Sequence, residues 1–479
     1  MAGNSEDIKV LEKCRVAPPP DAVAEFTVPL SFFDMRWLIS DAEHHLHFYR
    51  FRHPCPNSKF IISSIKSSLS LVLKHFLPLA GNLIWPVDSS DRMPELRYKK
   101  GDSVSLTIAE SSMDFDYLAG DHQRDSYKFN DLIPQLPEPI VTSGDEVLPL
   151  FALQVTVFSN TGICIGRNLH QVLGDASSFL HFNKLWVLVD KSNGDSLKFL
   201  PLSSLPMYDR SVVQDPFHIR RKIYNERKLL KSQGTPTVLN PAISKDEVRA
   251  TFILHPIDIM KLKKFISSKN RNLTGSSNYN LSTFTVTSAL IWTCLSKSLD
   301  TVVREKVEED KHAANLCAFI NCRQRFAPPI PQNYFGNCIV PCMVGSTHEQ
   351  LVGNEGLSVA ATAIGDAIHK RLHDYEGILR GDWISPPRST SAAPRSTLIY
   401  VVGSAQRNVH DFDADFGWGK LEKHESVSTN PSATLILISR SRRFKGALEL
   451  GISLPKNRMD AFATIFTNFI NSLHVRSPL

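Results

Sequence analysis

The stretch from Leu150 to Leu188 decides the fold, and it reads LFALQVTVFSNTGICIGRNLHQVLGDASSFLHFNKLWVL. Apolar and polar residues alternate over residues 150–158, which predicts a half-buried strand. Residues 160–162 (Asn-Thr-Gly) supply a turn, and residues 163–167 return as a second strand. The stretch therefore begins as a hairpin.

A short polar loop and then a helix follow this hairpin. The loop holds His170, Gln171 and Asp175. From Ala176 the period changes, because large apolar residues recur three or four positions apart, as on the buried side of a helix. A strand, a loop and a helix in this order hold reactive side chains rigidly at the edge of a core, so this loop is the candidate site.

Length and composition are those of an ordinary globular protein. The 479 residues exceed one small core, which predicts two domains, and 42% of them are hydrophobic. The net charge of +6 is mild, and the sequence contains no Lys/Arg block interleaved with aromatic residues. It therefore does not predict a nucleic-acid partner. The N-terminus lacks the apolar core of a signal peptide, no apolar run reaches bilayer length, and the eight cysteines show no repeated framework. We therefore expect a cytoplasmic monomer with reduced thiols and no membrane insertion.

Composition shifts divide the chain. Prolines and a charged helical segment fill residues 191–248, which is typical of a crossover linker between two domains. We expect an N-terminal domain over residues 1–190 and a C-terminal domain over residues 249–479. A cluster of His44, His45 and His47 matches no closed set of metal ligands, and no carboxylate or Cys partner is evident, so we predict no metal site.

Four short motifs are distributed along the chain. They are Leu-x-x-Phe-Leu-Pro-Leu-Ala-Gly at 73–81, Gly-Asp at 174–175, Tyr-Phe-Gly-Asn-Cys at 334–338 and Asp-Phe-Gly-Trp-Gly at 415–419. In this order they resemble the plant BAHD acyl-CoA-dependent acyltransferases, in the anthocyanin and flavonoid glucoside malonyltransferase-like branch. The resemblance implies an α/β fold of two similar domains, with mixed β-sheets flanked by helices and a solvent tunnel between them, as in chloramphenicol acetyltransferase.

The same resemblance implies an activity. It predicts an O-acyltransferase that moves a malonyl or hydroxycinnamoyl group from CoA to a sugar hydroxyl of a flavonoid or other phenolic glucoside in plant specialised metabolism. Acyl-CoA is then a co-substrate, and no bound cofactor is expected. Ser177 stands where some malonyl-preferring relatives carry Arg, so the sequence leaves the donor open.

The resemblance also assigns roles to residues. Asp175 is expected to pair with Arg323 and to fix the shape of the loop, and Asn321 replaces the family's Asp before Cys-Arg. The residues expected to line the tunnel or to contact CoA are Thr285, Tyr334, Phe335, Gly336 and Asn337. The motif at 415–419 is expected to be architectural, and its residues are Asp415, Phe416, Gly417, Trp418 and Gly419.

The candidate loop departs from the family pattern at its most telling position. The family loop reads N-H-H-x-x-G-D, with the second His as the general base. Aligned on Gly174 and Asp175, the base position falls on Gln171, and His170 stands one place early. A neutral imidazole suits proton removal near neutral pH, whereas a carboxamide has no useful proton affinity there. General-base assistance typically raises the reaction rate by about 10²–10⁴-fold, so replacing the base should lower the rate strongly.

Four accounts of this loop stay open. His170 could swing in as the base, although adjacent residues at a strand end point in different directions. Acyl transfer could be weak, or it could be assisted by the substrate itself. The tunnel could be reused for binding, for partnership with another enzyme or for a base-independent reaction, which would make the chain a non-acylating relative. Finally, Gln171 could be an engineered replacement of the base.

Overall fold

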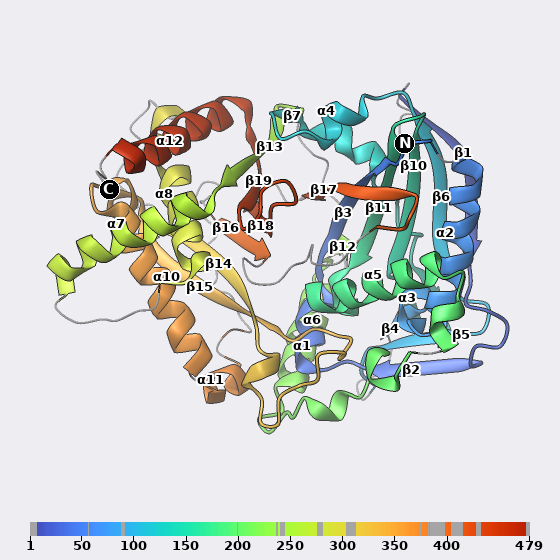
Figure 1. The fold of residues 1–479 in the computed structure, drawn as a ribbon. Coiled ribbons are helices and arrows are strands. Elements are labelled where there is room, and N and C mark those ends of the chain that lie inside the picture. Colours follow the sequence, from blue (N-terminus) through green and yellow to red (C-terminus); the bar gives the residue numbers. More distant parts are fainter. Residues whose placement is uncertain are drawn as a thin grey trace.

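A computed structural model describes residues 7–55, 57–87, 92–198, 200–235, 238–239, 245–274, 281–302, 313–373, 375–381, 383, 398–403, 415–427 and 433–475. Figure 1 shows two lobes side by side, each with a sheet and helices packed against it. No helix in these described ranges is both long enough and apolar enough to cross a bilayer.

The first lobe is built mainly from the N-terminal part of the chain. Its elements are β1 (Ile8–Val16), β2 (Glu25–Pro29), α1 (Phe32–Met35), η1 (Arg36–Leu38), β3 (Ser40–Phe51), α2 (Ser58–Leu73), α3 (Leu77–Ala80), β4 (Asn82–Pro86), β5 (Glu95–Lys99), β6 (Val104–Ser111), α4 (Phe115–Ala119), β7 (Arg124–Asp125), η2 (Ser126–Leu132), β8 (Ile140–Thr142), β9 (Asp145–Pro149), β10 (Phe151–Phe158), β11 (Gly162–His170), η3 (Gln171–Leu173) and α5 (Ala176–Lys191). The elements that follow α5 are η4 (Asp195–Lys198), η5 (Leu202–Ser204), η6 (Arg210–Val212), α6 (Ile219–Ser232) and β12 (Val238–Leu239).

The second lobe follows. It comprises β13 (Glu247–Leu254), α7 (Pro256–Thr274), α8 (Thr283–Val302), β14 (Ala313–Asn321), η7 (Arg323–Arg325), β15 (Ile339–Thr347), α9 (His348–Val352), α10 (Gly356–His373), α11 (Tyr375–Arg380), β16 (Leu398–Gly403), β17 (Gly419–Val427), β18 (Ala433–Arg440), β19 (Leu448–Pro455) and α12 (Lys456–Val475).

The predicted hairpin is confirmed as β10 and β11, which pair antiparallel in the first sheet. The prediction that its first strand is half-buried was wrong, because every residue of β10 is buried. This sheet runs β1-β6-β10-β11-β3-β12, and β6 and β10 pair in parallel, so the sheet is mixed. One boundary was wrong. The second strand continues to His170, because its ladder with β3 extends as far as Ala42. His170 therefore lies at the end of a strand, and the loop begins at Gln171.

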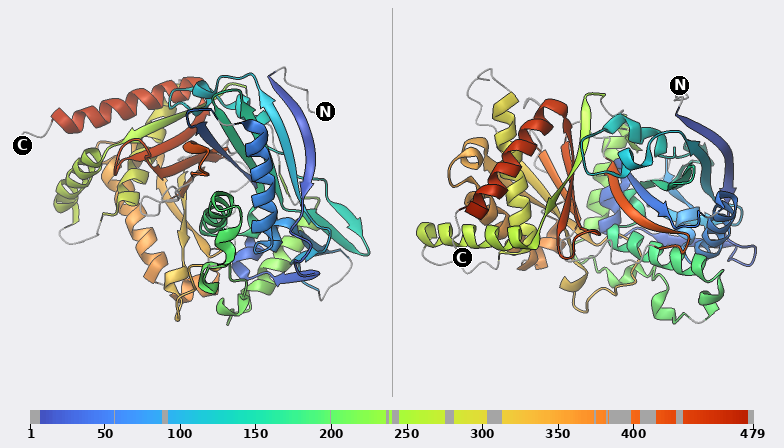
Figure 2. Two further views of the ribbon diagram at one scale, coloured as in Figure 1. Left: turned by 45° about the vertical axis from the view of Figure 1, so that its right-hand side comes forward. Right: turned by 45° about the horizontal axis from the view of Figure 1, so that its top comes forward.

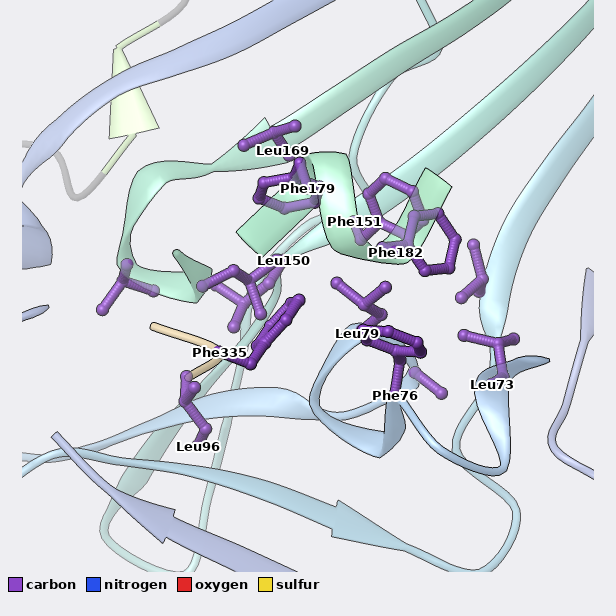
Figure 3. Packing of buried hydrophobic residues seen from close by; sticks show 14 of the residues in the cluster. Leu73, Phe76, Leu79, Leu96, Leu150, Phe151, Leu169, Phe179, Phe182 and Phe335 are labelled. Carbon is purple, nitrogen blue, oxygen red and sulfur yellow. The ribbon is translucent and has the colours of Figure 1, made fainter. Parts of the chain in front are cut away.

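Aromatic residues fill the core of the first lobe. Phe179, Phe182 and Trp186 on α5 are buried against the sheet, as their helical spacing predicted. Phe76, which follows α2, packs edge-on against Phe182 with ring centroids 5.2 Å apart. Burial of each such side chain contributes roughly 1.5–3 kcal/mol. In Figure 3, Phe335 from the other half of the chain lies among these residues, 5.3 Å from Phe76.

The second lobe has a mixed sheet of its own, in the order β15-β14-β16-β18-β19-β13-β7. β16 pairs in parallel with β14 and with β18, and the other neighbours are antiparallel. Buried residues of α7, α8, α10 and α12 form its core together with the sheet. A separate five-stranded sheet runs β2-β5-β4-β9-β8. The predicted α/β class with mixed sheets in two domains is confirmed, whereas the tunnel stays a prediction.

The two lobes exchange strands. β17, from the C-terminal half of the chain, pairs with β3 and extends the first sheet (Figure 1; Figure 2, right). In return, the short β7 pairs with β13 and extends the second sheet. The predicted division at residues 190 and 249 did not foresee this exchange, because a strand's partner is not visible in its local pattern.

A buried ionic cluster lies where the exchanged strands meet. Glu425 on β17 accepts from Arg124 of β7 at 2.8 Å and from Arg249 of β13 at 2.5 Å. All three side chains are buried. Burial by itself would raise the pKa of Glu425, but Arg249 and Arg124 outweigh this effect and lower the pKa from 4.5 to about 2.

Glu425→Gln should destabilise the protein by about 3–5 kcal/mol at neutral pH, because two buried arginines lose their counter-charge. Because its pKa is lowered, the Glu425 carboxylate stabilises the folded protein above pH 4.5, and this stabilisation is lost as the pH falls toward about 2. Urea unfolding of wild type and variant should therefore give stabilities that converge over this window. The control Glu422→Gln, on the exposed side of the same strand, should cost less than about 1 kcal/mol. Equal losses from both variants would contradict the assignment.

Candidate active site

Asp175 holds the candidate loop in place. It is the N-cap of α5, and its Oδ1 accepts the backbone N–H groups of Ser177 and Ser178 at 3.0 and 3.3 Å. The guanidinium of Arg323 donates to both carboxylate oxygens, at 2.6 and 3.0 Å. Both side chains are buried. Burial would lower the pKa of Arg323, but Asp175 reverses that effect and raises it. The pair that the resemblance implied is therefore present.

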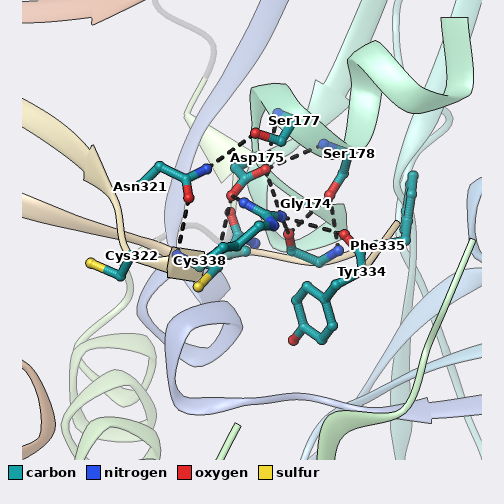
Figure 4. A network of polar contacts seen from close by, with 12 residues as sticks. Gly174, Asp175, Ser177, Ser178, Asn321, Cys322, Tyr334, Phe335 and Cys338 are labelled. Atoms are coloured by element: carbon teal, nitrogen blue, oxygen red, sulfur yellow. Dashed lines mark hydrogen bonds and ion pairs between the residues drawn. The ribbon is translucent and has the colours of Figure 1, made fainter. Parts of the chain in front are cut away.

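The segment at 334–338 closes around the same pair. The N–H of Cys338 donates to Asp175 Oδ2 at 3.0 Å, and Arg323 donates to the carbonyl of Gly336 at 3.0 Å. Ser178 Oγ donates to that carbonyl at 2.9 Å and accepts from the Gly336 N–H at 3.0 Å. The approach is so close that a Cβ at Gly174 would lie 2.9 Å from Ser178 Cβ, which explains the glycine. Figure 4 shows the two segments interlocked.

A second buried pair, which the sequence analysis missed, supports the other side of this segment. The N–H of Asn337 donates to Asp34 Oδ1 at 2.8 Å, and Arg210 Nε donates to Asp34 Oδ2 at 3.2 Å. Arg210 also donates to the carbonyl of Phe335 at 2.7 Å. The sequence carries a signal for part of this arrangement, because Ser31 and Asp34 have the spacing of a helix capping box.

The predicted tunnel residues are thus placed, but no ligand tests their role. Tyr334, Phe335 and Asn337 are buried, and any contact of theirs with CoA stays a prediction. Thr285 lies in the first turn of α8, where its hydroxyl and the Ser282 hydroxyl are 2.8 Å apart. Its contact with a ligand also stays a prediction.

Gln171 lies between two acceptors. Its side chain is buried, with 4% of the residue exposed. The Nε2 group donates to Asn337 Oδ1 at 3.2 Å, and Asn337 Nδ2 donates to the backbone carbonyl of Gln171 at 2.9 Å. The amide oxygen faces the carboxylate of Glu43 on β3, and turning the amide over lets its nitrogen donate to Glu43 Oε2 at 2.8 Å.

His170 is enclosed. Its residue exposure is 0%, and its Nδ1 accepts the N–H of Val172 at 3.2 Å, which makes it the N-cap of η3. Its catalytic role stays a prediction. The histidine cluster differs from expectation in one respect, because a carboxylate partner does exist: Glu43 Oε2 lies 3.4 Å from His45 Nε2. Glu43 and His45 are two residues apart on β3 and therefore lie on the same face of the strand.

The remaining family positions take structural contacts. Asn321 donates to Ser177 Oγ at 3.1 Å, and its own oxygen accepts the N–H of Arg323 at 3.0 Å. Phe416 and Trp418 stack with ring centroids 5.1 Å apart. Asp415 accepts the N–H of Gly417 at 2.8 Å, and Gly419 begins β17. The motif at 415–419 thus leads the chain into its exchanged strand. Among the described residues, no group of three His, Cys, Asp or Glu side chains is arranged to hold a metal ion.

Comparison with known proteins gives consistent results. The model of the Transferase family matches residues 7–468. Phenolic glucoside malonyltransferase 1 of Nicotiana tabacum is 41% identical, over 97% of this chain and 99% of its own. An Arabidopsis thaliana coumaroyl-CoA:anthocyanidin 3-O-glucoside-6''-O-coumaroyltransferase is 32% identical, over 97% and 98%. The crystal structure of vinorine synthase superposes with a TM-score of 0.64 at 17% identity, covering 95% and 96%, which shows the shared fold.

Asp175→Asn should destabilise the protein by about 3–5 kcal/mol, because the buried charge of Arg323 loses its partner. An Asn side chain can still cap a helix, so the loss reports mainly on the ion pair. Denaturant unfolding measures it. Asp114→Asn, at the exposed N-cap of α4, is the matched control and should leave the midpoint nearly unchanged. If the two variants unfold alike, the pair does not hold the loop.

Proposed function

The chain belongs to the Transferase family, that of the plant BAHD acyltransferases, and from this premise we propose that it moves an acyl group from CoA to a sugar hydroxyl of a phenolic glucoside. The names of its relatives support this substrate class, because they are a phenolic glucoside malonyltransferase and an anthocyanidin glucoside coumaroyltransferase. The donor is then a malonyl or hydroxycinnamoyl thioester. We further propose that acyl-CoA is a co-substrate without any bound cofactor, and that the protein is a cytoplasmic monomer.

One observation carries the proposal. The Asp175–Arg323 pair joins the loop at the end of β11 to the segment at 334–338, so two motifs from opposite halves of the chain are held in contact, which supports a shared site. The buried pair fixes the start of α5 and therefore the position of residue 171. Asp175 is a positioning residue, because Arg323, Cys338 and the helix N-terminus occupy its oxygens.

The reaction requires a proton acceptor. The sugar oxygen attacks the thioester carbonyl and loses its proton, and the C–S bond then breaks as the sulfur takes up a proton to give free CoA. Gln171 occupies the usual base position, and its amide cannot accept that proton near neutral pH. Orientation of the two substrates still lowers the barrier, so we propose a native enzyme rather than an inert one.

Purified protein, incubated with malonyl-CoA or coumaroyl-CoA and an aryl glucoside, should release CoA thiol and form an acylated glucoside detectable by mass spectrometry. A reaction without the glucoside is the control for simple hydrolysis. Gln171→His supplies an imidazole at the usual base position and should remain active with the same pairs. If the wild type is inert with every pair while Gln171→His gains turnover, the native protein is a non-acylating relative and the proposal fails.

A further inference from the structure

A row of titratable side chains begins at Glu43, beside Gln171, and follows one face of the first sheet. Glu43, His45 and His47 alternate along β3, so they share a face, and His424 of β17 stands opposite His47 in the ladder. His45 Nε2 lies 3.4 Å from Glu43 Oε2, and its Nδ1 lies 3.2 Å from His424 Nε2. The rings of His47 and His424 stack with centroids 4.5 Å apart.

The side-chain amide of Gln171 lies between Asn337 and Glu43. Asn337 Nδ2 donates to the backbone carbonyl of Gln171 at 2.9 Å and to Asp34 Oδ1 at 3.1 Å. Asn337 therefore presents its side-chain oxygen to the side chain of Gln171. Glu43 presents carboxylate oxygens from the other side. An amide has one donor end and one acceptor end, so the side chain of Gln171 can donate either to Asn337 or to Glu43.

The side chain of Gln171 bridges these two neighbours. Its amide nitrogen donates to Asn337 Oδ1 at 3.2 Å in one orientation and to Glu43 Oε2 at 2.8 Å in the other. The Glu43 carboxylate therefore lies within hydrogen-bond distance of residue 171, which occupies the usual base position.

Access separates Glu43 from the other candidate. The side chain of Glu43 is 44% exposed, so a substrate hydroxyl can approach its carboxylate directly. His170 is fully enclosed, and one of its ring nitrogens already accepts a backbone N–H. A general base has to come within hydrogen-bond distance of the proton that it removes. Of these two groups, only Glu43 meets that condition without a rearrangement of β11.

We propose that Glu43 is the proton acceptor of this enzyme, a role that rests on the acyl transfer proposed above. Its carboxylate takes the proton of the sugar hydroxyl as the sugar oxygen bonds to the thioester carbonyl carbon. When the tetrahedral intermediate collapses and the C–S bond breaks, Glu43 returns the proton to the leaving sulfur. Gln171 and His45 are positioning residues that hold the carboxylate in place.

Glu43→Gln tests the proposal, because it keeps the shape of the side chain and removes its proton affinity. We expect kcat to fall by about 10²–10⁴-fold with little change in KM, and the fall of kcat/KM toward acid pH in the wild type to disappear. Glu43→Asp should retain part of the activity and its pH dependence. Glu25→Gln, an exposed Glu on β2, is the control and should leave kcat unchanged.

A second variant separates lost chemistry from lost structure. Glu43→Gln combined with Gln171→His supplies an imidazole at the usual base position and should recover turnover, with a melting temperature equal to that of the single variant. If wild type and Glu43→Gln have the same kcat and the same pH profile, Glu43 is not the acceptor, although acyl transfer itself stands. If the wild type transfers neither malonyl nor coumaroyl groups, the proposed function fails first and this inference fails with it.

Discussion

The buried pair of Asp175 and Arg323 is the interaction on which the site depends. Neither side chain reaches solvent, so each charge is satisfied only by the other and by the backbone groups around it. Taking two ions out of water is unfavourable unless their geometry is nearly ideal, and removing either partner leaves a buried charge. The start of α5, the last turn of the loop and the segment at 334–338 are therefore specified together.

This constraint explains how the loop can keep its shape after losing an imidazole. The backbone around residue 171 is set by Asp175 behind it and by Asn337 beside it, and neither contact depends on the side chain at 171. The amide can therefore occupy the position without collapse of the site. Its two polar ends then couple Asn337 to a carboxylate on the neighbouring strand, which is a contact that depends on the side chain at 171.

Local patterns predicted much of this molecule. The period near 3.6 identified α5 because this helix buries one face. The period of two located β10, although the strand is buried along its whole length. The pairing of Asp175 with Arg323 came from family resemblance and not from any local signal. The contacts of Glu43 with Gln171 and of Asp34 with Asn337 were missed, because these partners lie far along the chain and no periodicity records which distant residue a carboxylate will meet.

The exchange of β17 and β7 has a consequence for biosynthesis. The long central strand β3 is made early, yet the neighbour that covers most of one of its edges is encoded near the end of the chain. Until residue 427 has left the ribosome, that edge offers unpaired backbone groups to any other extended segment. The nascent first lobe is thus an unfinished sheet throughout most of translation, and it acquires this edge partner only when β17 has been made.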